Sequence, residues 1–208
     1  MHLADGALDL PTIGISVAST AFGLAIGLRK LTAQTLPIAA LFAAVFFVVG
    51  TIHIPLGIGS VHLVLNGLIG VLLGWLAFPV IFVALALQAL LFSFGGFTAL
   101  GANTLLLATP GVLAHFIFRA QLRDPRSSQR QLMLIGAAAA TIGIVGAVLI
   151  TAALLWSTGQ NALISLAVAI GIAQVPVWVI DAAVSALALA MLGRAMPRVF
   201  GLSNTPAR

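Results

Sequence analysis

The residues of this chain best suited to bind a transition metal are its four histidines, because the chain contains no cysteine. They are His2, His53, His62 and His115. His2 belongs to the opening stretch MHLADG, and His53 and His62 bracket the link HIPLGIGSVH between two apolar runs. Spacing alone leaves two interpretations open for these three histidines: a metal site, or hydrogen-bonded residues with a structural role.

The start of the chain could form a chelate. A free α-amine at Met1, the backbone nitrogen of His2 and the Nδ1 of its imidazole can bind one metal ion and close a five-membered and a six-membered ring. Such nitrogen ligands suit metals that accept square-planar geometry, such as Cu(II) or Ni(II). One further imidazole would complete a plane of four nitrogens. The alternative is a disordered terminus, which is common at chain ends.

The composition excludes an ordinary soluble domain. Of 208 residues, 62% are hydrophobic and only 6% are charged, whereas soluble domains carry about 25% charged residues. A net charge of +5 would suggest nucleic-acid binding in a soluble protein, but the basic residues here lie in short loops between apolar runs. We therefore predict an all-α, polytopic membrane protein, embedded in the lipid bilayer as a single domain over residues 1–208, with no nucleic-acid partner.

About seven apolar runs approach the length of roughly 20 residues that a helix needs to cross a bilayer. Pro79 is expected to end the third run, and Pro176 to divide the last one into a short outer helix and a final span. No basic residue precedes the first run, so a cleaved secretory signal is not expected. The runs are 12–28, 36–54, 62–78, 80–95, 103–118, 132–156 and 162–193.

The basic residues predict the orientation of the chain. With the N-terminus outside and seven crossings, all nine lysines and arginines fall on the cytoplasmic side, as the positive-inside rule requires. The reversed orientation would place all of them outside, and an even number of crossings would split them. The same orientation places His2, His53 and His62 near the outer face and His115 near the inner face. The nine are Arg29, Lys30, Arg119, Arg123, Arg126, Arg130, Arg194, Arg198 and Arg208.

Several polar residues fall inside or beside the predicted spans. Asp181 lies in the last span, where an ionisable residue is by default a functional candidate, and a hydrogen bond to another helix is the structural alternative. The stretch FGGFTALGANT (94–104) is too irregular to face lipid, so it is expected to be buried or to line a cavity, or else to form a tight turn. The amides expected to hold helices together are Asn66, Gln88, Asn103 and Gln174.

A stripe of small residues runs along the first predicted helix. Ser19, Gly23 and Gly27 are spaced four residues apart, and such spacing permits close approach of another helix. The partner is either a helix of this chain or a helix of another subunit.

Three stretches together resemble the CbiM/NikM family, the cobalt/nickel-specific substrate-binding components of energy-coupling factor (ECF) transporters. They are MHLADG, IHIPLGIGSVHLVLNGLIGVLLG (52–74) and LQALLFSFGGFTALGANT (87–104). PVWVIDAAVSA (176–186) is similar to the family's final-helix segment, where a Glu-Gly pair is more usual than Asp181-Ala182. The resemblance covers most of the chain and implies seven helices, a six-helix core with an added amino-terminal helix.

The resemblance also implies a ligand set. Ni(II) or Co(II) is the transported substrate, bound by the terminal amine of Met1, the amide nitrogen and imidazole of His2, and the imidazole of His62. His53 stands where a polar residue such as asparagine is expected, so it either supports the ligands or is an additional ligand. The choice between nickel and cobalt stays open, as does the use of the metal in cobalamin biosynthesis or in a nickel enzyme.

The resemblance implies partners as well. In an ATP-driven uptake transporter of the inner (plasma) membrane, this multi-pass chain would work with a transmembrane coupling (T) subunit, cytosolic ATPase subunits and a small accessory membrane protein. The chain has no GxxxxGK[ST] phosphate loop, so no ATP is expected to bind to it. The alternative is a stand-alone channel or secondary carrier for another small solute. An intramembrane enzyme has less support, since the chain has no H-E-x-x-H motif or acidic cluster.

Overall fold

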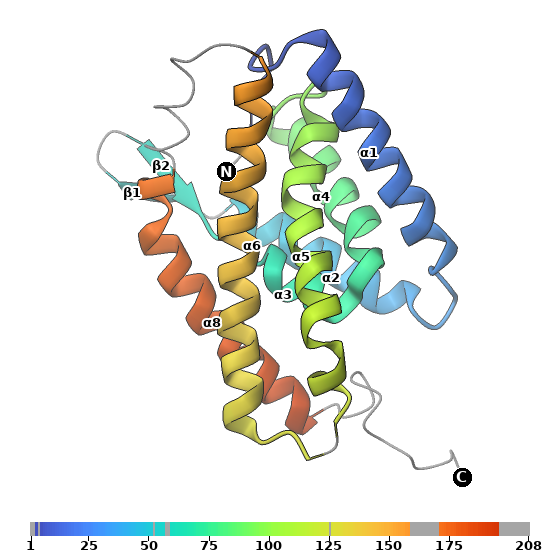
Figure 1. Ribbon diagram of the computed structural model, residues 1–208, viewed down its shortest axis with the longest axis vertical. Coiled ribbons are helices and arrows are strands. Elements are labelled where there is room, and N and C mark those ends of the chain that lie inside the picture. The colour runs from blue at the N-terminus through green and yellow to red at the C-terminus, as the bar shows by residue number, and fades with distance from the viewer. Residues whose placement is uncertain are drawn as a thin grey trace.

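The computed structural model describes residues 3, 5–51, 53–56, 59–124, 126–158 and 171–195, and their side chains except those of 53–62. Within this part, long helices pack side by side and a short β-hairpin lies at one side of the bundle (Figure 1). The elements are α1 (Leu10–Arg29), α2 (Leu36–Thr51), β1 (His53–Leu56), β2 (Gly59–His62), α3 (Asn66–Leu73), the 3-10 helix η1 (Gly74–Leu76), α4 (Ala77–Phe92), α5 (Leu100–Leu122), α6 (Gln129–Ser157) and α8 (Val175–Ala195).

The helices of this bundle have the length and the apolar outer surface of membrane-spanning helices. Among the described residues, five helical runs are long and apolar enough to cross a membrane, and α2 is a shorter apolar helix. Large apolar side chains such as Phe22, Leu149 and Met191 are exposed on the outside of the helices, where a soluble bundle would carry charged residues. The chain is therefore a polytopic helical membrane protein, as predicted. The five runs are Leu10–Arg29, Asn66–Phe92, Leu100–Leu122, Gln129–Ser157 and Val175–Ala195.

Local sequence signals set the ends of several helices. The Asp9 carboxylate caps α1 by accepting a hydrogen bond of 3.2 Å from the Thr12 amide, and a proline follows in the first turn. Ser128 and Gln131 form a capping box at the start of α6. Such caps satisfy amides that have no partner within their own helix. Pro176 lies in the first turn of α8, where proline is tolerated; the short outer helix expected before it falls largely outside the described residues.

The third and fourth predicted spans differ from expectation. The chain turns at Gly74, with φ 56° and ψ −128°, whereas Pro79 lies inside the first turn of α4 and ends nothing. Glycine adopts such a backbone conformation at little cost, and a proline near a helix start breaks no intrahelical hydrogen bond. α3 has only eight residues, about 12 Å of helix, so it does not cross a bilayer alone. The predicted start at residue 62 is instead the end of strand β2.

Glycines let α3 sit in the centre of the bundle. A Cβ on Gly70 would collide with the backbone of Gly111 in α5, and a Cβ on Gly67 with the backbone of Ala139 in α6. The buried amide of Asn66 donates hydrogen bonds to the carbonyl oxygen of Leu107 in α5, at 3.0 Å, and to that of Gly143 in α6, at 3.1 Å. Backbone-to-backbone contact and one shared amide thus fix α3 against two long helices.

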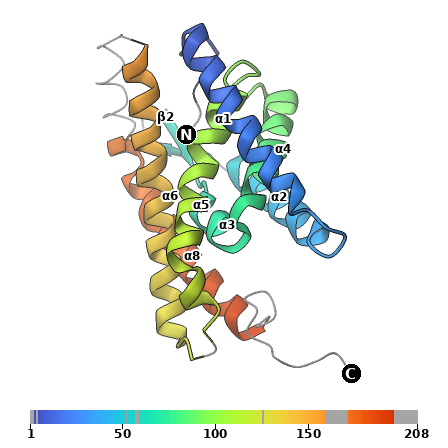
Figure 2. The same cartoon turned by 45° about the vertical axis from the view of Figure 1, so that its right-hand side comes forward.

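The two ends of the bundle carry different features: the hairpin lies toward one end, and arginines lie toward the other. The β1–β2 hairpin and the first turns of α1 and α5 lie toward the upper end (Figures 1 and 2). The carboxyl ends of α1, α5 and α8 point away from that end, and each carries an arginine in its last turn. This separation agrees with the predicted placement of the basic residues. The outward orientation of the upper end remains a prediction, and Arg198 and Arg208 lie outside the described residues.

Candidate functional site

The amino-terminal segment is attached to the start of α5 by a reciprocal pair of hydrogen bonds. The Leu3 amide donates to the Asn103 side-chain oxygen at 2.7 Å, and the Asn103 side-chain nitrogen donates to the Leu3 carbonyl at 3.0 Å. Both residues are buried. We call this pair the Leu3–Asn103 clamp. Asn103 was expected to join helices, and it instead fixes the segment that follows the proposed chelate.

A second attachment lies two residues further along the segment. One oxygen of the Asp5 carboxylate accepts hydrogen bonds from the Thr98 amide at 3.1 Å, the Thr98 hydroxyl at 2.5 Å and the Ala99 amide at 3.4 Å. The bond from the Thr98 hydroxyl lowers the pKa of the Asp5 carboxyl below its usual value. Asp5 is thus held as an anion against the turn that precedes α5.

Two glycines form the turn before α5 to which the Asp5 carboxylate is hydrogen-bonded. Gly95 and Gly96 both have positive φ, 76° and 77°. A Cβ on Gly96 would collide with the Asp5 carboxylate. The stretch 94–104 was expected to be buried, to line a cavity or to form a turn. Its second half is buried at Asn103 and Thr104, while Phe97 is exposed, so the stretch is a turn that leads into a buried helix start.

The link between the second and third runs is a β-hairpin. β1 and β2 pair antiparallel, and the register places His53 opposite His62. Residues paired in this way have Cα atoms about 4.5–5.5 Å apart. The backbone thus brings two of the four histidines together at one end of the hairpin. Their side chains, together with Met1 and His2, lie outside what the structure describes, so the proposed ligand set remains a prediction.

His115 lies apart from the hairpin, as the sequence predicted. Its Nδ1 is 2.9 Å from the carbonyl oxygen of Val71, near the end of α3. A Cβ on Gly74 would approach its ring at 3.0 Å, so this imidazole packs against the turn that follows α3. Among the described side chains, no group of three or more histidine, aspartate or glutamate residues is placed to hold a metal ion.

The other polar residues of the predicted spans are buried, and Gln88 joins two helices as expected. The Gln88 amide nitrogen in α4 donates to the Phe47 carbonyl in α2 at 3.1 Å, which joins two helices. Gln174 and Asp181 are also buried. Asp181 accepts a hydrogen bond of 3.2 Å from the amide of Leu65, a partner that the sequence did not indicate because the two residues are 116 positions apart.

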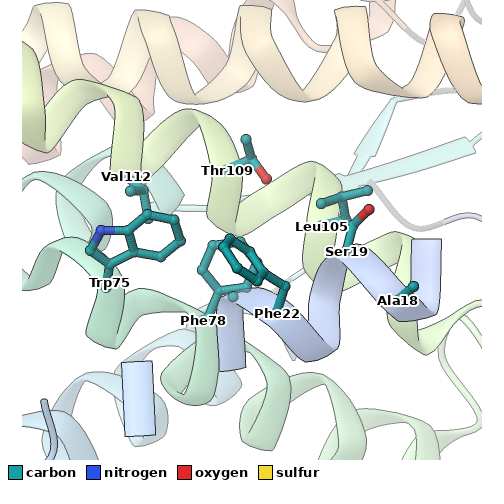
Figure 3. Close-up of a pocket in the computed structure, with 9 residues that line it drawn as sticks. Ala18, Ser19, Phe22, Trp75, Phe78, Leu105, Thr109 and Val112 are labelled. Atoms are coloured by element: carbon teal, nitrogen blue, oxygen red, sulfur yellow. The ribbon is translucent and has the colours of Figure 1, made fainter. Parts of the chain in front are cut away.

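Ser19 and Gly23, two of the three small residues of the stripe on α1, line a hollow between α1, η1–α4 and α5. It has a volume of about 490 Å³ and an aromatic wall formed by Phe22, Trp75 and Phe78 (Figure 3). A Cβ on Gly23 would collide with the Phe78 ring, and one on Gly27 would lie 2.6 Å from Pro79. The two glycines therefore pack against other helices of this chain, the first of the two alternatives. Among the described residues, those that line this hollow include no histidine or acidic residue.

Comparison with known proteins gives a consistent picture. A family model described as "Cobalt uptake substrate-specific transmembrane region" matches residues 2–199. A Haemophilus influenzae protein assigned to metal transport is 42% identical over 199 residues, which are 96% of each chain. The fused nickel transport protein NikMN of Rhodobacter capsulatus is 35% identical over 159 residues, 73% of this chain and 46% of that protein. This chain therefore spans about half of that longer relative.

Solved structures give the same fold. The crystal structure of a truncated transition metal transporter superimposes with a TM-score of 0.66 at 22% identity, covering 95% of this chain and 99% of that one. At this level of identity the likeness concerns the arrangement of the helices.

Proposed function

Because this chain belongs to the CbiM family of cobalt- and nickel-transport membrane proteins, and not to a family of enzymes, we propose that it captures the metal for an ATP-driven uptake transporter. In this proposal Ni(II) or Co(II) is the substrate, and the ligands are the amine of Met1, the amide nitrogen and imidazole of His2, and the imidazole of His62. The single observation that carries the proposal is the Leu3–Asn103 clamp, which attaches the segment next to the proposed chelate to the end of the bundle where the hairpin lies.

The clamp supports the proposed chelate because it fixes the residue to which His2 is covalently joined. His2 precedes Leu3 directly, and consecutive Cα atoms are about 3.8 Å apart. Leu3 is buried, and both its amide and its carbonyl are hydrogen-bonded to Asn103. The backbone from which Met1 and His2 extend is therefore fixed. A chelate on a fixed segment loses less conformational entropy on binding than one on a free chain end. The attachment of Asp5 to the turn before α5 restrains the same segment from the other side.

The hairpin supports the role of His62. Register pairs it with His53, so both imidazoles belong to one short piece of backbone. We assign His62 as the fourth nitrogen ligand and His53 as its neighbour, either a supporting group or an additional ligand. Nitrogen donors in a tetragonal arrangement suit Ni(II). Because the amine must lose a proton from a pKa of about 7.7–8.0, metal binding should strengthen as the pH rises toward that range.

The transporter context is also part of the proposal. The chain would act as one membrane-embedded domain over residues 1–208, in the plasma membrane with its amino end outside. A transmembrane coupling subunit, cytosolic ATPases and a small accessory membrane protein would supply energy and release. The names of the fused nickel transport proteins among the relatives support such partners, because those chains join additional sequence to the part that this chain spans.

Nickel titration of the protein with an unmodified amino end, tagged only at its carboxyl end, tests the proposal. Wild type should bind one Ni(II) tightly. A glycine added before Met1, or His62→Ala, should abolish tight binding while the thermal unfolding temperature stays near that of wild type. His115→Ala is the matched histidine control and should keep one tight site per folded chain. Equal affinity with and without the added glycine would refute the chelate.

A further inference from the structure

Asp181 is a carboxylate enclosed in the membrane-spanning part of the bundle. It is 0% exposed, and its Oδ2 accepts a hydrogen bond of 3.2 Å from the Leu65 amide. Its Oδ1 has no hydrogen-bond partner among the described residues. An ionisable side chain in a membrane span is costly to keep. The one partner that Asp181 has is therefore the place to look for its role.

That partner has an unusual backbone. Leu65 is the residue before α3, with φ 50° and ψ 14°, in the left-handed region that L-residues other than glycine, asparagine and aspartate rarely adopt. Ser93, another described residue of this kind, ends α4, where a left-handed residue is common. Leu65 instead begins a helix, where an extended backbone is the rule. It has no polar side-chain group to stabilise this conformation locally, and it is buried.

The left-handed turn is held on both sides by hydrogen bonds. The Leu65 carbonyl accepts a hydrogen bond of 2.9 Å from the Ile69 amide, and this is the first hydrogen bond of α3. The Leu65 amide would have no partner within the helix, because it precedes the first turn. The Asp181 carboxylate, brought by α8 from 116 residues away, is its acceptor. α8 therefore completes a turn that belongs to a different part of the chain.

This turn joins the centre of the bundle to the hairpin. On one side, α3 is fixed against α6 and α5 by Gly67 and Gly70. On the other side, strand β2 ends at His62, three residues before Leu65, and the buried Val64 lies between them. Because α3 is fixed, the conformation of Leu65 sets the direction in which β2 leaves it.

We propose that Asp181 is a positioning residue that holds the left-handed turn at Leu65 and thereby fixes the strand that ends in His62 for metal binding. The inference rests on the proposed function in that it takes His62 as a ligand. Asp181 itself touches no proposed ligand among the described contacts, and it acts through the backbone of Leu65. Its oxygen works as a hydrogen-bond acceptor, so a neutral acceptor of the same shape should replace it.

Two substitutions at Asp181 separate this role from simple burial of a charge. Asp181→Ala removes the acceptor, whereas Asp181→Asn keeps a side-chain oxygen in reach of the Leu65 amide. Ser185→Ala is the matched control, because Ser185 lies one turn further along α8, is 0% exposed and has a hydroxyl without a partner among the described residues. The measurements are Ni(II) affinity and hydrogen–deuterium exchange of the Leu65 amide in the metal-free protein.

We expect Asp181→Ala to weaken nickel binding by up to roughly tenfold, the effect of losing one ordinary hydrogen bond, and to speed exchange at Leu65. Asp181→Asn and Ser185→Ala should stay close to wild type in both measurements. In a Leu65→Gly background, Asp181→Ala should change the affinity little, because glycine adopts positive φ without support. A loss of affinity of the same size in both backgrounds would overturn the positioning role.

The same experiment separates failure of this inference from failure of the proposed function. Wild-type protein that binds no nickel with an unmodified amino end refutes the proposed function. Leu65 exchange in the metal-free protein then decides alone whether Asp181 holds the turn. If wild type binds nickel and Asp181→Ala matches it in affinity and in Leu65 exchange, the positioning role is refuted while the proposed function stands.

Discussion

Removal of the Leu3–Asn103 clamp should weaken metal binding without unfolding the bundle. Asn103→Leu keeps the branching and the number of heavy atoms of the side chain and removes both hydrogen bonds to Leu3, those of 2.7 and 3.0 Å. Each such bond contributes about 0.5–1.5 kcal/mol net, so the two together contribute about 1–3 kcal/mol. If the clamp orders the segment for the chelate, this free energy is lost from binding, which corresponds to roughly a 5- to 150-fold weaker Kd.

The assay is competition of the purified protein with a chelator of known nickel affinity, together with thermal unfolding of the metal-free protein. Thr104→Val is the matched control. Thr104 is the next residue, is 0% exposed, and its hydroxyl donates only within its own helix, to the Leu100 carbonyl at 2.8 Å. The Thr104→Val variant should therefore bind nickel with wild-type affinity. Faster amide exchange at Leu3 in Asn103→Leu, combined with an unchanged Kd, would show that the clamp does not position the chelate.

Three further predictions concern stability. Gly96→Ala should cost about 1–2 kcal/mol for a side chain at positive φ plus the collision with the Asp5 carboxylate; Gly6→Ala, also at positive φ but with nothing within 4 Å, should lower the unfolding temperature less. Because the folded-state pKa of Asp5 is lowered, the ionised carboxylate contributes its full stabilisation of the fold above the usual pKa of 3.8 and loses it as the pH falls through the folded-state pKa. The difference in unfolding free energy between wild type and Asp5→Asn should therefore shrink at low pH. A constant difference from pH 6 to 3 would contradict this prediction. Gly23→Leu should destabilise the isolated protein by about 1–3 kcal/mol through overpacking, whereas Gly14→Leu on the same helix, with open space around it, should not, and equal unfolding temperatures would contradict the packing.

The sequence predicted features that depend on local pattern. Apolar runs gave the long helices, and the buried amides Asn66 and Gln88 join helices as expected. Proline position was less informative. Pro79 was expected to end a helix, yet a proline in a first turn fits a helix start. The real break is at Gly74, and a glycine in an apolar run does not reveal whether it bends the chain or makes room for another helix.

The site was predictable only in part, because its described contacts join distant positions. Leu3 and Asn103 are 100 residues apart, and Leu65 and Asp181 are 116 apart. The sequence singled out Asn103 and Asp181 as polar residues in apolar surroundings, and their partners are backbone groups, which carry no residue-type signal. The hairpin was expected only as a tight link. The left-handed backbone of Leu65 was not predictable, since leucine is not among the residue types that routinely adopt this conformation.

The central place of α3 has a consequence for the order in which this protein can be completed during synthesis. The Asn66 amide needs the Gly143 carbonyl, which is made 77 residues later. At about 5–20 residues per second, roughly 4 to 15 seconds separate the two. During that interval α3 has no α6 to pack against, and the Asn66 amide has only the Leu107 carbonyl of α5 as an acceptor. A chain truncated before α6 should therefore hold α3 against α5 alone, with one of the two hydrogen bonds of the Asn66 amide missing.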